Sequence, residues 1–282
     1  MLMTRAPRQL GTSVVALGLV ALLAAPAAAQ NGPNSGNASV SGGMHFTNAY
    51  FFRGITQDDS GVIMWPAAEV SLNLHKSDTS RVSLAFGSWN SLHTGDAGSD
   101  GPSGKLWYES DFYTTLGLGF GMVGANATYT AYTSPNSAFG TVKELSLGLS
   151  VDDSEALGAA ALQPYLVIAR ELDGQADGGE NEGTYLELGV GPGWGNDRVS
   201  LLFPIKLGMS LGDYYEGPGG DERFGYVSVG ARLAVPLRGV PEVFGAWELS
   251  GGVEFLRLGT ATEALYGENS KVMGTFGISM SY

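Results

Sequence analysis

The residues of this chain that could do chemistry are acids on the polar side of alternating segments. Between residues 69 and 76, Val70, Leu72 and Leu74 alternate with polar side chains, and Glu69 belongs to the polar set. Alternate residues of a β-strand share one face. The same parity places further charged residues on the polar face of other segments: Glu109, Asp111, Glu144, Glu187, Lys206, Arg232, Glu248 and Glu254. A face of this kind predicts a polar or water-filled interior.

A second candidate is the serine at position 91. Ser91 and His93 lie two positions apart and follow Asn90, and a hydroxyl within hydrogen-bond reach of an imidazole can act as a nucleophile. The other histidines, His45 and His75, fall on different segments, and no H-x-x-x-H or carboxylate-histidine spacing indicates a metal site. We therefore interpret Ser91 and His93 as loop residues, and we expect neither catalysis nor a metal or other cofactor.

Two acidic, glycine-rich stretches could suggest calcium. GDAGSDGPSG covers residues 95–104 and DGQADGGENEG covers residues 173–183. Oxygen-rich loops bind Ca²⁺, but neither stretch matches the EF-hand loop or a repeated nonapeptide. We interpret both as solvated loops, which could share divalent cations with lipopolysaccharide phosphates.

Composition excludes several classes of protein. The chain of 282 residues has a formal net charge of -13, which argues against binding nucleic acid. It has no cysteine, so disulfides, thiolate chemistry and a lipid-anchoring cysteine are excluded. Its 43 glycines are scattered singly through apolar segments, which favours sheet over disorder.

The N-terminus predicts a cleaved signal peptide over residues 1–29. Arg5 and Arg8 precede an uncharged apolar run of residues 10–25, and an A-x-A cleavage site follows Pro26. That run is shorter than the roughly 20 residues that span a membrane. Residues 30–38 then form a flexible lead-in, and residues 39–282 the mature domain.

Period-2 alternation recurs along residues 39–282. Segments of about ten alternating residues separated by turns are the signature of a transmembrane β-barrel. Twelve such segments fit the sequence: residues 39–52, 65–76, 81–90, 105–119, 122–134, 142–151, 162–171, 184–191, 198–210, 224–235, 246–258 and 271–281. The predicted fold is an all-β, antiparallel, up-and-down barrel. Two long turns, at residues 152–160 and 236–245, leave ten or fourteen strands open.

The connections also alternate in length. Tight turns follow the second and fourth segments, whereas long, acidic, glycine-rich loops follow the first, third, seventh, ninth and eleventh. Short periplasmic turns and long external loops are the arrangement of outer-membrane barrels. We therefore expect the bacterial outer membrane, with its lipids and lipopolysaccharide as partners.

The last segment carries a second signal. Phe276, Ile278, Met280 and Tyr282 alternate with small residues, and the chain ends on an aromatic. This pattern resembles the C-terminal strand read by the outer-membrane assembly machinery, which we therefore expect as a partner.

The first segment ends in the aromatic run YFFRGITQ. Its parity predicts that Phe46, Tyr50 and Phe52 face lipid as part of an aromatic girdle and that Arg53 points into the lumen near the outer mouth. The run resembles a Tyr-x-Phe-Arg-Gly-x-Ser/Thr-Gln pattern in the first strand of a group of uncharacterised, porin-like proteobacterial outer-membrane proteins. That resemblance implies a barrel and no particular activity.

Three interpretations of the charged interior stay open. Glu187, Lys206, Arg232 and Glu254 could link neighbouring strands in a closed, ion-paired core without transport. The surplus carboxylates could instead line a narrow water-filled path that favours cations or neutral polar solutes, since twelve strands enclose more space than the eight that side chains fill. A specific ligand site is the third.

We expect a monomeric, narrow, porin-like channel for small polar or cationic solutes. The closed structural barrel is the alternative. A lipid hydrolase is more remote: the outer-membrane phospholipase resembles this chain in strand number, but its His-x-Ser order is reversed at Ser91 and His93.

Overall fold

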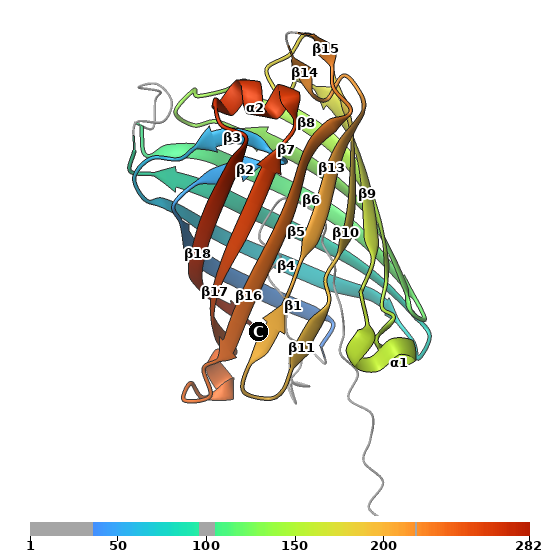
Figure 1. Cartoon of the computed structure of the whole chain (residues 1–282). Helices are drawn as coiled ribbons and strands as arrows, with labels where there is room; N and C mark the ends of the chain where they lie inside the picture. The colour runs from blue at the N-terminus through green and yellow to red at the C-terminus, as the bar shows by residue number, and fades with distance from the viewer. Residues whose placement is uncertain (1–35, 96–104, 218) are drawn as a thin grey trace, which may run out of the picture.

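The computed structural model describes residues 36–95, 105–217 and 219–282. The predicted signal peptide, most of the predicted lead-in and most of the 95–104 stretch lie outside the described residues. The described chain folds into one closed barrel, whose strands run obliquely around a central axis (Figure 1).

The barrel wall is a single antiparallel sheet. Its strands, in chain order, are β1 (Ala38–Thr47), β4 (Ile63–Lys76), β5 (Ser80–His93), β6 (Trp107–Phe120), β7 (Val123–Thr133), β8 (Val142–Val151), β9 (Tyr165–Asp173), β10 (Thr184–Val190), β11 (Gly193–Gly195), β12 (Ser200–Leu202), β13 (Ile205–Gly212), β16 (Phe224–Pro236), β17 (Ala246–Leu258) and β18 (Ser270–Ser281). The sheet has 14 strands by hydrogen bonding. β11 continues β10 beyond Pro192, and β12 leads into β13 at Pro204, so each of these two pairs crosses the wall once. The wall therefore has 12 spanning strands. Pairing of β1 with β18, from Ser41↔Ser281 to Thr47↔Thr275, joins the first strand to the last.

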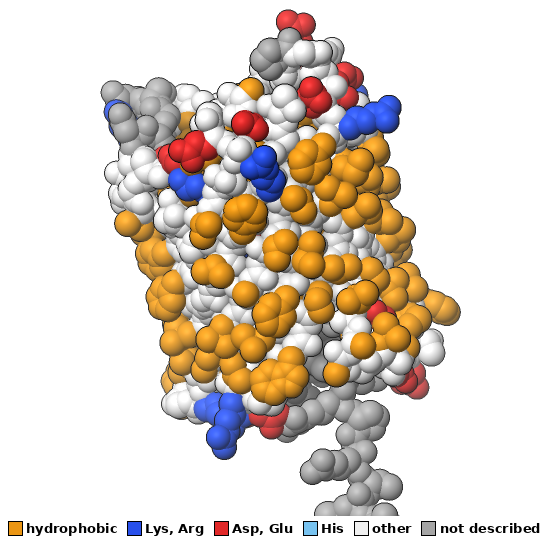
Figure 2. Space-filling view, in the orientation of Figure 1, with side chains coloured by type: hydrophobic (Ala, Val, Ile, Leu, Met, Phe, Trp, Pro, Cys, Tyr) orange, Lys and Arg blue, Asp and Glu red, His pale blue; other side chains and the backbone are white. Residues whose placement is uncertain are grey.

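The outer surface of the wall is apolar. Large hydrophobic side chains exposed on it come from every part of the sheet: Val70, Leu72, Leu74, Phe112, Leu116, Leu118, Leu145, Leu147, Leu149, Ile168, Leu188, Val229, Leu233, Val253, Phe255, Val272 and Phe276. On the face shown in Figure 2, hydrophobic side chains form a broad band, and most of the charged side chains lie toward the two ends. A closed sheet satisfies its backbone hydrogen bonds internally and can therefore stand in lipid. The chain is an outer-membrane β-barrel.

The two ends of the barrel differ. One end, which we call the turn end, has mostly short connections. Its two longer turns, at residues 152–160 and 236–245, contain no extra strands: the first holds α1 (Ser154–Leu157) and η1 (Gly158–Ala160), and the second holds η2 (Glu242–Phe244). The predicted count of twelve strands is therefore confirmed. At the loop end lie α2 (Thr260–Tyr266) and the small hairpin of β14 (Glu216–Gly217) and β15 (Gly220–Asp221) (Figure 1).

The first predicted strand was drawn too long. β1 ends at Thr47, and the chain then forms a short hairpin of β2 (Tyr50–Phe52) and β3 (Ile55–Asp58), which we call the plug hairpin. Tyr50 and Phe52 are buried, at 4% and 8% exposure, so the prediction that they face lipid is wrong; Phe46 alone keeps the outward parity. No helix among the described residues is long and apolar enough to cross a membrane.

The lipid face of β18 gives a direct test of the membrane assignment. Phe276→Lys should destabilise the folded barrel by about 2 to 4 kcal/mol, because its ammonium would sit in hydrocarbon near mid-strand. Ser279→Lys is the matched control, because Ser279 lines the lumen in register with Glu248. Urea titrations in lipid vesicles, followed by heat-modifiable gel mobility, would measure both. Equal stability of the two variants would contradict the assignment.

Candidate functional site

The plug hairpin is the central feature of the lumen. It turns through Arg53 and Gly54, whose φ values are 50° and 84°. A Cβ on Gly54 would lie 2.9 Å from Cδ1 of Tyr226, so this close approach to the wall also requires glycine. Both sides of the hairpin are packed against neighbouring side chains, so it fills part of the loop-end half of the lumen.

Two aromatic clusters hold the hairpin. On one side Tyr50 packs edge-on against Trp65, with ring centroids 5.5 Å apart, and against Trp89 at 5.4 Å. Phe52 packs against Tyr132 at 5.2 Å in the same cluster. The other side belongs to a second cluster, in which Ile55 is buried with these aromatic residues of the wall and loops: Tyr185, Tyr214, Tyr215 and Tyr226.

A buried ion pair fixes the tip of the hairpin. The Arg53 guanidinium makes two parallel hydrogen bonds to Glu144 on β8, of 2.5 and 2.8 Å, and both side chains are about 99% buried. The guanidinium also lies 4.3 Å from the ring centroid of Tyr185 and donates to the Tyr214 hydroxyl at 2.8 Å. Tyr215 donates in turn to the Arg53 carbonyl. Such an arrangement satisfies a buried charge through a paired, planar contact.

The residue that follows β3, Asp59, ties the hairpin to α2 and β18. Lys271 and Tyr266 both donate to the Asp59 carboxylate, at 2.7 and 3.0 Å. These hydrogen bonds, that from Lys271 foremost, hold the pKa of Asp59 below its usual range. Phe51 packs edge-on against Tyr266, so α2 and the hairpin are joined.

Several carboxylates of the wall are satisfied by neighbours. Glu187 accepts hydrogen bonds from Tyr165, Tyr185 and Tyr226, at 2.7 to 2.9 Å. Glu69 accepts one from Tyr113. These acids are therefore held in a hydrogen-bonded interior.

Glu109 and Asp111 differ from the other acids. They lie on β6 beside the plug hairpin at 4% and 1% exposure, and one oxygen of each has no hydrogen-bond partner in the described part of the chain. No cation of the described residues forms an ion pair with either. The pair is thus a buried, uncompensated acidic site behind Tyr50.

Ser91 and His93 are not loop residues, contrary to expectation. They lie on β5, fully buried, with Ser91 Oγ 2.6 Å from His93 Nε2 and His93 Nδ1 2.8 Å from Asp58 Oδ2 on the hairpin. Trp65 Nε1 donates to Ser91 Oγ at 3.1 Å. With His93 neutral and protonated at Nδ1, Trp65 donates to Ser91, Ser91 to His93 and His93 to the Asp58 carboxylate. This series of hydrogen bonds has the geometry of a Ser-His-Asp triad.

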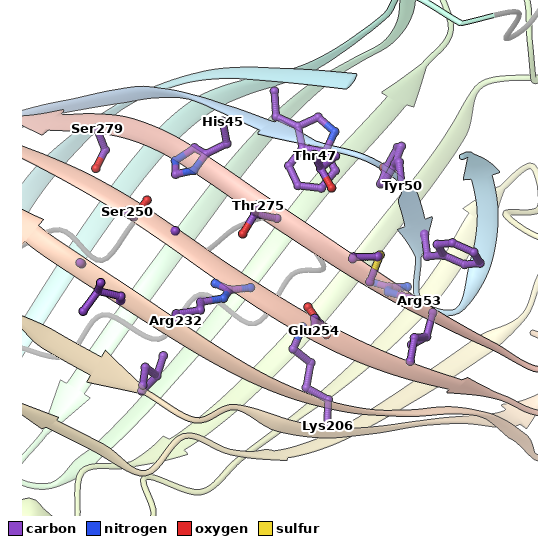
Figure 3. Close-up of a pocket in the computed structure, with 18 of the residues that line it drawn as sticks. His45, Thr47, Tyr50, Arg53, Lys206, Arg232, Ser250, Glu254, Thr275 and Ser279 are labelled. Atoms are coloured by element: carbon purple, nitrogen blue, oxygen red, sulfur yellow. Dashed lines mark hydrogen bonds and ion pairs between the residues drawn. The ribbon is translucent and has the colours of Figure 1, made fainter. Parts of the chain in front are cut away.

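Beneath the hairpin, toward the turn end, the lumen contains a cavity of about 110 Å³ (Figure 3). Five of the predicted charged residues line it: Arg53, Lys206, Arg232, Glu248 and Glu254. Lys206 pairs with Glu254 at 3.3 Å. The other five do not line it: Glu69, Glu109, Asp111, Glu144 and Glu187. The predicted pore lining is therefore divided between this cavity and the packed region around the hairpin, except for Glu69, which lies in mid-strand on β4 and is bonded to Tyr113.

Sequence reasoning missed residues of two kinds. The parity that selected Glu187 also selects Tyr185. On β9 the inward-facing positions Val167 and Ala169 are followed two residues later by the buried Glu171, so both Tyr185 and Glu171 could have been found. Asp58, Tyr214 and Tyr215 lie in loops or in the hairpin, and no periodic signal marks them.

Comparisons with known proteins find similarity to distant barrels. Neither a protein-family model nor a curated protein matches the sequence. Among solved structures, outer membrane phospholipase A from Escherichia coli is 9% identical, with a TM-score of 0.44 over 85% of this chain and 92% of that one. An outer membrane channel from Pseudomonas putida F1 is 10% identical, with a TM-score of 0.42 over 87% and 94%. At these values no function passes from them to this chain.

The buried ion pair makes a sharp stability prediction. Arg53→Met should destabilise the barrel by about 3 to 5 kcal/mol, because it leaves the Glu144 charge buried and unpaired. Combining it with Glu144→Gln should restore most of that loss, because no uncompensated charge remains. Lys143→Met is the matched control: it breaks an exposed pair with Asp173 and should change stability by about 1 kcal/mol or less. Denaturant titration would measure Arg53→Met, Glu144→Gln, their combination and Lys143→Met, and additive effects at Arg53 and Glu144 would contradict the account.

Proposed function

We propose that this barrel is a narrow, gated outer-membrane channel for small polar or cationic solutes, with the plug hairpin as its gate. The observation that carries the proposal is a short hairpin lying inside the lumen, between a cavity on one side and the loop end on the other. One ion pair at its tip and two aromatic clusters hold it closed. Movement of this single element would open a continuous path.

The proposed selectivity follows from what the hairpin covers. Glu109, Asp111, Glu144, Glu171 and Glu187 are all buried in the loop-end half of the lumen. When the hairpin leaves, Arg53 leaves with it, and Glu144 loses its paired cation. An acidic ring of this kind attracts cations and repels anions.

Replacing residues 50–58 with a glycine-serine segment of equal length should raise the conductance of the barrel in a planar bilayer. The same replacement of residues 175–182, in another loop at this end, is the control and should leave conductance near that of the unaltered chain. Heat-modifiable mobility confirms folding in each case. If the folded barrel conducts no ions even without the hairpin, the closed structural barrel is the better account.

In the hairpin-free barrel, Glu109→Gln with Asp111→Asn should lower the cation preference measured as a reversal potential across a salt gradient. The effect should be largest at low salt, where the Debye length is about 30 Å at roughly 0.01 M. An unchanged reversal potential would remove these two acids from the proposed selectivity.

A second candidate, an ester hydrolase, is favoured by the Ser91, His93 and Asp58 geometry. Opposing it, Ser91 is fully buried, and the hairpin that would have to move for access supplies Asp58. The gate account predicts that a fluorophosphonate probe does not label Ser91 in the folded barrel. Labelling that Ser91→Ala abolishes, and that Ser88→Ala does not, would establish the hydrolase instead.

A further inference from the structure

The cavity beneath the plug hairpin has two cationic or potentially cationic side chains that lie across glycines. His45 on β1 is opposite Gly277 on β18, and Arg232 on β16 is opposite Gly252 on β17. A Cβ on Gly277 would lie 2.3 Å from His45 Nδ1, and one on Gly252 would lie 3.1 Å from Arg232 Cγ. Each glycine therefore leaves the space that lets the neighbouring side chain extend along the wall.

The side chains of His45 and Arg232 extend toward the same part of the cavity. Gly277 is opposite Ser250, and Gly252 is opposite Thr275, so the two rows are adjacent on the wall. His45, Ser250, Thr275 and Arg232 thus surround one part of the cavity, as Figure 3 shows.

The donors around this part of the cavity are unused. His45 is buried, with 7% of its surface exposed, and its Nε2 has no hydrogen-bond partner in the described part of the chain. In the described chain, the Arg232 guanidinium forms no hydrogen bond or ion pair, and the hydroxyls of Ser250 and Thr275 likewise donate to no group. The half-buried donors of Arg232, Ser250 and Thr275 border the cavity and are available to an acceptor that enters it, and the buried, unpaired nitrogen of His45 lies beside them.

Among the described residues that line the cavity, Lys206 and Arg232 balance Glu254 and Glu248, and Arg53 is paired with Glu144. Lys206 and Arg232 are two cations beside one near carboxylate, Glu254, and Lys206 is already paired with it. Glu248 also lines the cavity, four residues before Gly252 on β17, at the row nearer the turn end. With Lys206 held by Glu254, Arg232 is the described lining cation left to pair with an anion, and the two carboxylates would repel a dianion more strongly than a monoanion.

The end of the cavity nearer the hairpin is partly apolar, because three apolar side chains there lie beside Arg53 and the ion pair of Lys206 and Glu254. Phe51, Leu256 and Met273 line it, on the loop-end side of Arg232 and Thr275. A cavity of about 150 Å³ accepts benzene, so one of about 110 Å³ takes a smaller molecule. We propose that this cavity binds a short-chain aliphatic monocarboxylate, with the carboxylate on Arg232, His45, Ser250 and Thr275 and the alkyl end toward Phe51 and Leu256.

The site does not depend on whether the barrel conducts, so the test is an equilibrium one. The full mature chain, refolded in detergent, would be titrated with propionate by ligand-observed NMR, with chloride held constant. Arg232→Met should weaken propionate binding by about 10- to 100-fold, and Thr275→Val by about 3- to 10-fold, the effects of losing a charged and a neutral hydrogen bond. Arg238→Met is the matched control, because Arg238 is exposed on the turn after β16.

Each outcome decides the proposal. Propionate binding that is lost in Arg232→Met, weakened in Thr275→Val and unchanged in Arg238→Met supports it. No propionate binding by the folded wild-type barrel overturns it, as does binding that survives Arg232→Met. Propylammonium or inorganic phosphate binding as tightly as propionate, in an Arg232-dependent way, overturns the assigned ligand class.

Discussion

The buried pair of Arg53 and Glu144 is the interaction on which the interior of this barrel depends. It joins the tip of a hairpin formed near the N-terminus to a strand on the far side of the lumen. Because a charge of either sign is costly away from water, the two partners keep each other in place. The aromatic side chains around them exclude water and at the same time fill the loop-end half of the barrel. What would otherwise be an open acidic vestibule is therefore a packed core.

This arrangement separates the luminal acids into two groups with different environments. Those near the hairpin are buried among tyrosines, with Glu109 and Asp111 lacking a compensating cation. Glu248 and Glu254 line the cavity beneath the hairpin together with Lys206 and Arg232. Opening and ligand binding would then use different parts of one lumen, the first governed by the hairpin and the second by the wall. The glycines opposite His45 and Arg232 matter because they turn a wall of alternating side chains into one with a recess.

Most of the fold follows from alternation, because every wall strand contacts lipid on one face and the interior on the other. That contrast predicted the strand count and nearly all boundaries. It failed at residues 48–52, where aromatic side chains are buried in the lumen instead of in lipid. Alternation predicts that an apolar side chain is buried away from water, but it does not predict whether that side chain contacts lipid or the packed interior of the barrel. Asp58 could not be assigned to His93 either, since nothing local brings a hairpin residue to β5. Residues of the site could be predicted from the sequence only where they lie on regular strands, as with Glu187, Arg232 and Glu254.

The central claim is that the hairpin closes the lumen through its charged tip. The absence of cysteine makes single-cysteine labelling clean. The Asp111→Cys variant would be reacted with a membrane-impermeant cationic thiosulfonate, both in the otherwise unaltered barrel and in combination with Arg53→Met. The account predicts slow reaction in the first, far below that of a cysteine at the loop position 178, and marked acceleration in the second. Fast reaction in the unaltered barrel, or equal rates with and without Arg53, would contradict it.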